Sequence, residues 1–177
     1  MRPLKDRYLS TFSGKKFFPF NPHPDQIDIV DIAHGLSLLC RFSGQCPTFF
    51  SVAEHSIYVA DRLPDDLKLA GLLHDSSEAY LADLPRPVKV GIPEYKSLEM
   101  SVGAVIAQKL NLEFPTSASV MCADRAVLKH EIFTFFGAQR YLEDFGEEYQ
   151  PGVSQHILGF SPKEAEEKFL DLYWSLT

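Results

Sequence analysis

Residues 70–89 read Ala70-Gly-Leu-Leu-His-Asp-Ser-Ser-Glu-Ala-Tyr-Leu-Ala-Asp-Leu-Pro-Arg-Pro-Val-Lys89, and in them an apolar run leads into a dense set of ionisable residues. The apolar spacing predicts a helix over residues 66–81, ended by the proline pair in Pro85-Arg-Pro87. His74 and Asp75 stand side by side within this helix. A residue that only packs in a hydrophobic core is normally apolar. So many ionisable residues in one stretch therefore indicate a functional site.

The same periodicity predicts helices on both sides of this stretch. A capping-box pattern, Ser51 with Glu54, opens one of them, and Ser161-Pro-Lys-Glu164 opens the last. The expected helices cover residues 28–40, 51–63, 94–110, 117–136 and 161–176. With the helix over 66–81 they predict an all-α fold of five to six or more helices.

The N-terminal part is irregular and rich in aromatic residues. The segment Thr11-Phe-Ser-Gly-Lys-Lys-Phe-Phe-Pro-Phe20 contains a Ser-Gly turn between short aromatic runs, which predicts a small hairpin. The following Asn21-Pro-His-Pro24 excludes regular structure. A chain of 177 residues with 45% hydrophobic content is long enough for one good core. We therefore expect a single domain, residues 1–177, whose residues 1–26 form an aromatic arm.

Composition narrows the possible partners and compartments. The net charge is -7 and no segment concentrates Lys and Arg, so we expect no nucleic-acid polymer as a partner. The three cysteines are odd in number and form no CxxC pair, which favours reduced thiols. The first residues contain no apolar signal core, and no apolar run is long enough to span a bilayer. We expect a soluble cytoplasmic protein, in the host cytoplasm if it is viral, that binds no membrane.

Two histidines and two aspartates have the chemistry of a metal site: His55, His74, Asp75 and Asp124. Imidazole suits Zn, Fe and Co, whereas carboxylate suits Mg and Mn, so a mixed set describes a borderline site with positions open for water and substrate. His55 alone is more simply a core histidine, and Asp124 alone a helix cap. Their convergence depends on tertiary packing, which spacing does not prove.

Other polar residues of the stretch suggest a reaction on a phosphate ester. Glu78 follows His74 by four positions and Asp75 by three, so in a continuous helix it shares their surface, where a carboxylate can orient or deprotonate a water. Asp83 either caps a turn or contacts substrate. The positive charge that a phosphate needs comes from Arg41, Arg86 and Lys89.

Together these residues resemble a known family. His55, then His74-Asp75, then Asp124 are similar to the H...HD...D signature of the HD-domain superfamily of metal-dependent phosphohydrolases. More narrowly, Val52-Ala-Glu-His-Ser56 and the stretch from His74 to Lys89 resemble segments of bacterial HD-type 5′-deoxynucleotidases and of phage dATP triphosphohydrolases. The similarity extends over residues 41–89 and again near Asp124.

The resemblance implies an all-α HD fold that hydrolyses a nucleotide phosphate bond with one divalent ion, Mn, Co, Zn, Fe or Mg. The ion would be bound by His55, His74, Asp75 and Asp124, with Asp75 and Glu78 as the catalytic residues. Glu78 would position or activate the attacking water, and Asp83 would contact the sugar 3′-hydroxyl. The substrate contacts would be Arg41, Phe42, Asp83, Arg86, Pro87 and Lys89, with Phe42 standing where the 5′-deoxynucleotidases have tryptophan. A homodimer or higher homo-oligomer is also implied.

The substrate is open between a deoxynucleoside monophosphate, such as dAMP, and a triphosphate, such as dATP. A triphosphate needs additional cations, for which Arg86, Lys15 and Lys16 are candidates, and a phage origin would favour dATP. Signalling-nucleotide hydrolases of the superfamily carry an acidic pair after the doublet, which this chain lacks. Its phosphodiesterases need extra histidines for a second metal, and none occurs between Asp75 and Asp124. A nucleotide-sensing, metal-stabilised binding module is the non-enzymatic alternative, and Glu78 argues against it.

Overall fold

The computed structural model describes residues 3–150 and 157–177; the remaining positions of the expected arm and domain, residues 1–2 and 151–156, lie outside it. The described residues fold mainly into helices with one short antiparallel hairpin, so the predicted all-α class is confirmed. The elements are η1 (Leu4–Asp6), β1 (Leu9–Ser10), β2 (Lys16–Phe17), η2 (Pro24–Gln26), α1 (Ile29–Leu38), η3 (Arg41–Gly44), α2 (Val52–Asp61), α3 (Asp65–Leu72), α4 (Glu78–Leu81), α5 (Arg86–Val90), α6 (Pro93–Leu110), α7 (Ala118–Phe145) and α8 (Pro162–Leu176).

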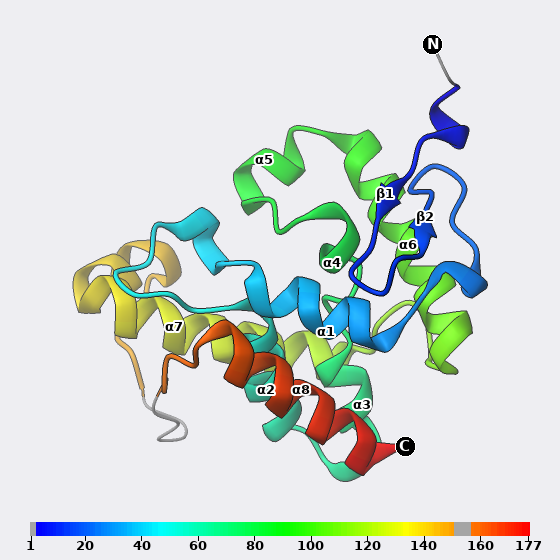
Figure 1. Cartoon of the computed structure of the whole chain (residues 1–177). Coiled ribbons are helices and arrows are strands. Elements are labelled where there is room, and N and C mark those ends of the chain that lie inside the picture. The colour runs from blue at the N-terminus through cyan, green and yellow to red at the C-terminus, as the bar shows by residue number, and fades with distance from the viewer. Residues whose placement is uncertain (1–2, 151–156) are drawn as a thin grey trace.

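Helix α2 lies at the centre of the molecule. Its residues 52–60 are all buried, and it packs against α1, α3, α7 and α8 (Figure 1). The main core extends from Phe17 in the hairpin to Phe169 in α8, both fully buried. A helix that is covered on all sides is held rigidly by its neighbours, so α2 is a firm base for any functional side chain it carries.

The predicted helix starts are largely confirmed by their caps. The side chain of Ser161 accepts from the backbone N–H of Glu164, whose carboxylate in turn accepts from Ser161, which is the predicted capping box. Only half of the capping box at Ser51 forms. The Ser51 side chain accepts from the backbone N–H of Glu54, but the Glu54 carboxylate does not accept from the backbone N–H of Ser51. The buried Glu54 carboxylate instead accepts from the backbone N–H groups of Gly159 and Phe160, each at 2.9 Å.

The single helix predicted over residues 66–81 is wrong. Helix α3 ends at Leu72 and α4 begins at Glu78, with a turn between them. In this turn, the Ser76 hydroxyl donates to the carbonyl of Leu73 at 2.6 Å, and Nδ1 of His74 bonds to the carbonyl of Gly71 at 2.7 Å. Side chains that donate to nearby backbone carbonyls compete with the backbone hydrogen bonds of a helix. The spacing of apolar residues carries no sign of that competition.

Two other boundaries differ from expectation. Pro85 does not end the helix of the doublet, since α4 stops at Leu81, where Ala82 has a φ of 71°, and Pro85 caps the short helix α5 instead. Helix α7 extends beyond the predicted end, to Phe145, but its helical geometry is interrupted where the prediction ended, at Gly137, whose φ is 85° and ψ is 174°. A glycine tolerates this conformation, so one glycine can mark a break inside a helix as well as its end.

The hairpin predicted near Ser13 is confirmed, with Leu9 opposite Phe17 and Ser10 opposite Lys16. It is part of the core, not a free arm. The ring of Phe17 stacks on that of Tyr80 at 4.2 Å between centroids. The backbone N–H and hydroxyl of Ser13 donate to the carboxylate of Asp31 at 2.6 and 2.8 Å. Self-association through the hairpin stays a prediction.

The cysteines carry no disulfide in the part of the chain that the structure describes. The sulfurs of Cys40 and Cys46 lie 3.6 Å apart, and Cys122 is exposed. Burial raises the pKa of the Cys46 thiol to about 11, with the neighbouring Cys40 adding to the shift. None of the helices described is both long and apolar enough to cross a bilayer.

Candidate metal centre and cleft

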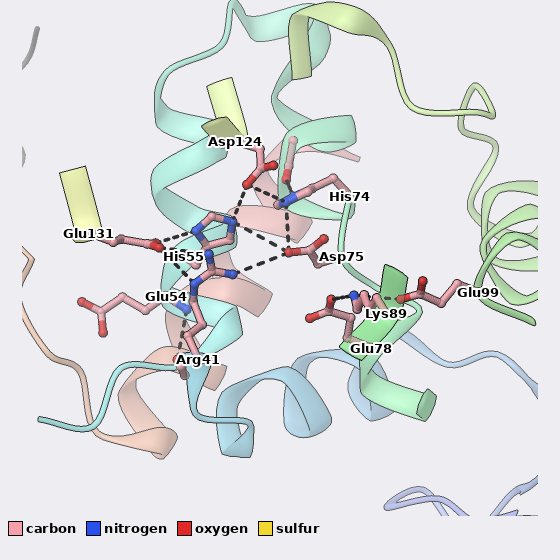
Figure 2. Close-up of polar contacts among 12 residues, drawn as sticks. Arg41, Glu54, His55, His74, Asp75, Glu78, Lys89, Glu99, Asp124 and Glu131 are labelled. Atoms are coloured by element: carbon pink, nitrogen blue, oxygen red, sulfur yellow. Dashed lines mark hydrogen bonds and ion pairs between the residues drawn. The ribbon is translucent and has the colours of Figure 1, made fainter. Parts of the chain in front are cut away.

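Three separate parts of the chain bring the four candidate metal ligands together. His55 lies in the middle of α2, His74 and Asp75 lie on the turn after α3, and Asp124 lies near the start of α7. Figure 2 shows the four side chains pointing toward a common point. His55 is fully buried, whereas the Asp124 side chain is 39% exposed, so the cluster is closed on the α2 side and open toward solvent at Asp124.

The distances within the cluster suit shared coordination. Nε2 of His55 lies 3.1 Å from Oδ1 of Asp124, and Nε2 of His74 lies 3.1 Å from Oδ2 of Asp75. The two crossed distances, His55 to Asp75 and His74 to Asp124, are both 3.8 Å. One ligand atom from each of His55, His74 and Asp124 lies within 4.8 Å of the others.

Both imidazoles direct Nε2 into the cluster because their Nδ1 atoms are engaged elsewhere. Nδ1 of His74 donates to the carbonyl of Gly71, since a carbonyl oxygen can only accept. Nε2 of His55 and Nε2 of His74 are buried, and neither forms a hydrogen bond with residues that the structure describes. A buried polar atom without a partner is unfavourable, and a divalent ion would satisfy both. The donor set therefore fits a metal.

The carboxylates of the cluster are ionised at neutral pH. Burial alone would raise the pKa of Asp75, but the charges of His74, His55 and Arg41 hold it well below its usual range. Asp124 also has a lowered pKa: burial opposes the shift, and the close contact and charge of His55, with the charge of His74, outweigh it. Burial likewise opposes protonation of His74, yet Asp75 and then Asp124 raise its pKa to about 9. The site is thus strongly attractive to positive charge.

Close packing between α2 and α3 brings the first two ligands together. A Cβ added to Gly71 would lie 2.4 Å from Cδ1 of Leu63 and 3.2 Å from Cα of Ala60, so a larger residue would have to move the Leu63 side chain and would press on the backbone of α2. The carbonyl of Gly71 also holds His74. The glycine before the doublet therefore both permits the approach of the helices and orients a ligand.

Sequence reasoning missed Glu131, which binds two of the predicted residues. It is fully buried on α7, accepts from Nδ1 of His55 at 2.6 Å, and accepts from Nε and Nη2 of Arg41 at 3.1 and 2.9 Å. The only signal in the sequence is an acidic residue seven positions after Asp124, on the same face of the helix. Such spacing is common on solvated faces, so it did not identify the site.

Glu78 lies beside the cluster rather than on one helical surface with it. The break between α3 and α4 overturns the predicted shared surface. Oε1 of Glu78 accepts from Nζ of Lys89 at 2.8 Å, while Oε2 is buried without a hydrogen bond to any described residue. Burial and the charges of Asp75 and Asp83 raise the pKa of Glu78 to about 8, although Lys89 opposes the shift.

A cleft of about 1170 Å³ opens beside the cluster. It is bounded by η3, the segment leading into α5, and α7. Asp75 and Asp124 lie in its wall, as do all the predicted substrate contacts: Arg41, Phe42, Asp83, Arg86, Pro87 and Lys89. Phe42 forms an aromatic corner with Phe135 and Phe136, with ring centroids 6.2 and 5.3 Å away. The cleft therefore joins cations, an apolar aromatic surface and the metal cluster.

Of the cations predicted to bind a longer phosphate chain, some line the cleft and others lie away from it. Arg86 lines the cleft, and so does Arg140, which was not predicted. Lys15 is in the hairpin, where its Nζ pairs with Asp28 at 3.0 Å, and Lys16 lies over the ring of Tyr8. Neither of these lysines lines the cleft.

A second, smaller cavity of about 440 Å³ adjoins the cluster. Its wall includes His74, Glu78 and Glu99, together with Asp75 and Lys89, which also line the large cleft. The metal cluster thus stands between two cavities of different character. The large one combines aromatic rings with four cations and four carboxylates, whereas the small one has five carboxylates and a single lysine.

The corner of the cleft at Phe42 has a strained backbone. Phe42 and Ser43 have φ values of 55° and 52°, in the left-handed region that bulky residues rarely adopt. Such strain persists only where surrounding contacts hold it, and it concentrates at functional sites. Here the contacts are the aromatic corner around Phe42 and the ion pair of the preceding Arg41 with Glu131.

The fold and the site together define a helical protein with a His and Asp cluster at the edge of a deep cleft. No family model matches the chain. It is 40% identical over 124 residues, 70% of each chain, to the uncharacterized protein YfdR of Escherichia coli strain K12. It is 32% identical over 133 residues to the uncharacterized protein RCAP_rcc00048 of Rhodobacter capsulatus, covering 70% of this chain and 68% of that one. The chain belongs to the family of YfdR.

Proposed function

We propose that this protein is a metal-dependent phosphohydrolase of the HD-domain type that cleaves the 5′-phosphate or triphosphate of deoxynucleotides. The observation that carries the proposal is the convergence of His55, His74, Asp75 and Asp124, with two buried Nε2 atoms that lack partners among the described residues. Two neutral imidazoles and two carboxylates are a ligand set for Mn, Co, Fe or Zn. Mg is the remaining candidate.

The chemistry supplied by a bound divalent ion would be Lewis acidity toward a phosphoryl oxygen and toward water. The neighbouring side chains would accept the proton and hold the substrate. Glu78 is the group placed to accept a proton from the attacking water; in its ionised form it is a stronger base than an ordinary carboxylate, because its pKa is raised to about 8. Its Oε2 atom is buried and has no hydrogen-bond partner among the described residues, so it is available for this contact.

The cleft supports a nucleotide as the substrate. Arg41 and Lys89 line the cleft on the side of the metal cluster, and both stay protonated because nearby carboxylates raise their pKa against the effect of burial. Phe42 and Phe136 offer an aromatic surface for a base. Asp83, a carboxylate in the same wall, is assigned to the sugar hydroxyl.

The phosphate count is the finer part of the proposal. A monophosphate would be held by Arg41 and Lys89. A triphosphate would need Arg86 and Arg140 as well, both of which line the cleft, whereas Lys15 and Lys16 do not. The cleft, at about 1170 Å³, exceeds the usual upper range of small-molecule sites, so its size is compatible with either substrate.

The test is a product assay with purified protein and Mn, Co, Mg and Zn in turn. The panel contains deoxy- and ribonucleoside mono-, di- and triphosphates, and the products are separated by chromatography. Release of phosphate from monophosphates alone establishes a 5′-nucleotidase. Release of triphosphate from dATP, or stepwise loss of its phosphates, establishes the triphosphohydrolase. An absence of turnover with every metal would overturn the proposal in favour of a nucleotide-binding module.

A further inference from the structure

One carboxylate, Glu131, connects the metal cluster to the phosphate side of the cleft. It lies on α7 two turns after Asp124 and is 0% exposed. Burying a carboxylate is unfavourable unless it is paired and fully hydrogen-bonded, and both of its oxygens have partners. One carboxylate oxygen accepts from His55 and the other accepts from Arg41; Figure 2 shows the contacts with both residues.

The first oxygen fixes the orientation of a metal ligand. Oε1 of Glu131 lies 2.6 Å from Nδ1 of His55, which donates to it. The opposite ring nitrogen, Nε2, is thereby left as the atom that faces Asp124 at 3.1 Å. A histidine whose second nitrogen donates to a carboxylate is fixed in one tautomer and is a more basic ligand.

The second oxygen fixes the guanidinium of Arg41. Oε2 accepts from Nε and from Nη2, so one edge of the planar group is held in place. The remaining Nη1 lies 3.9 Å from Oδ2 of Asp75 at the wall of the cleft. Because Arg41 precedes the two residues with positive φ, the ion pair with Glu131 also holds the start of that turn.

We propose that Glu131 is a positioning residue that orients His55 toward the metal and Arg41 toward the phosphate group at the same time. Loss of this carboxylate should therefore weaken metal binding and phosphate binding together. The part concerning phosphate rests on the proposed function, whereas the part concerning metal does not.

The decisive variant is Glu131→Gln, and its matched control is Glu54→Gln. Glu54 is also a fully buried glutamate, but it binds the backbone ahead of α8 and neither His55 nor Arg41. The probes are Mn²⁺ alone, and then inorganic phosphate at saturating Mn²⁺, both measured by titration calorimetry on the full chain. Thermal unfolding is measured in parallel, so that a loss of stability is separated from a loss of binding.

Glu131→Gln should weaken Mn²⁺ binding about 10- to 100-fold. Phosphate binding to the Mn²⁺-saturated variant should weaken by a further factor of about ten. Glu54→Gln should lower thermal stability and leave both affinities unchanged. Mn²⁺ affinity within about twofold of wild type in folded Glu131→Gln would overturn the proposal.

A second measurement needs no variant of Glu131. Nitrogen-detected NMR of the His55 ring in the wild-type protein should show a proton on Nδ1 that is protected from exchange. A ring protonated only on Nε2 would contradict the proposal. If wild type binds Mn²⁺ tightly, Glu131→Gln binds it weakly and neither hydrolyses a nucleotide, the metal part stands while the proposed function fails.

Discussion

Nζ of Lys89 donates to Oε1 of Glu78 at 2.8 Å, so the cation assigned to phosphate is directly bonded to the carboxyl group assigned to water activation. A second carboxylate, Glu99, lies equally close to Lys89 at 2.8 Å. A phosphate oxygen that binds Lys89 would compete with both. Glu78 would then be less stabilised as an anion and a stronger base, which couples substrate binding to proton transfer.

The first prediction concerns the role of Glu78. Glu78→Gln keeps the size of the side chain but removes its capacity to accept a proton. We expect turnover to fall by about 10²- to 10⁴-fold while Mn²⁺ and nucleotide still bind. Phosphate release measures turnover, and calorimetry measures binding. Glu99→Gln is the control, because it removes the other partner of Lys89 and should reduce turnover much less. Unchanged turnover in Glu78→Gln would remove Glu78 from the mechanism.

The second prediction concerns stability and pH. The pKa of Glu78 is about 8 in the folded protein against an ordinary value of 4.5, so the folded state holds this proton more tightly than the unfolded state. Stability supplied by the proton is fully present below pH 4.5 and is lost as the pH rises through 8. The effect is on the order of a few kcal/mol.

Glu78→Gln does not ionise, so the variant should lack this contribution to the pH dependence of stability. Thermal unfolding of both proteins in EDTA, from pH 5 to about 9, tests this linkage. The melting temperature of the variant should rise relative to wild type as the pH increases, and then level off. A difference that is the same at every pH would show that Glu78 is not responsible.

The third prediction concerns metal binding. Mn²⁺ at about 100 times its Kd should stabilise the folded protein by about 2.7 kcal/mol, which corresponds to a rise in Tm of roughly 5–10 °C. Asp124→Ala should remove most of this rise, and because the side chain is 39% exposed its replacement should not unfold the protein. Asp144→Ala is the control, since Asp144 also lines the cleft but pairs with Arg140. Equal Tm shifts in both variants would place the ion elsewhere.

The fourth prediction concerns the anchor of α8. Glu54→Ala would leave the backbone N–H groups of Gly159 and Phe160 without their acceptor and would remove the hydrogen bond that the hydroxyl of Tyr58 donates to Glu54. The free energy of unfolding should fall by about 3–5 kcal/mol in a urea titration. Ser161→Ala, which removes only the N-cap of α8, should cost about 1 kcal/mol. Similar losses in the two variants would mean that Glu54 does not hold α8 in place.

Much of the fold follows from local patterns in the sequence. The spacing of apolar residues and the caps at Ser51 and Ser161 located several helices, because a helix start needs a side-chain acceptor for its free N–H groups. The hairpin at Ser13-Gly14 also followed from local turn chemistry. The four residues whose atoms converge could be named for their chemistry, before their distances were known.

The helical class and the chemical types of the site residues can be predicted from the amino-acid sequence, since both depend on local composition and spacing. The break at His74 and the two contacts of Glu131 became visible only in the three-dimensional structure. In the first, side-chain hydrogen bonds within the turn compete with the helical ladder. In the second, Glu131 contacts His55 across 76 positions of the chain, and packing of α7 against α2 creates that contact. No local periodicity encodes a contact between residues so far apart.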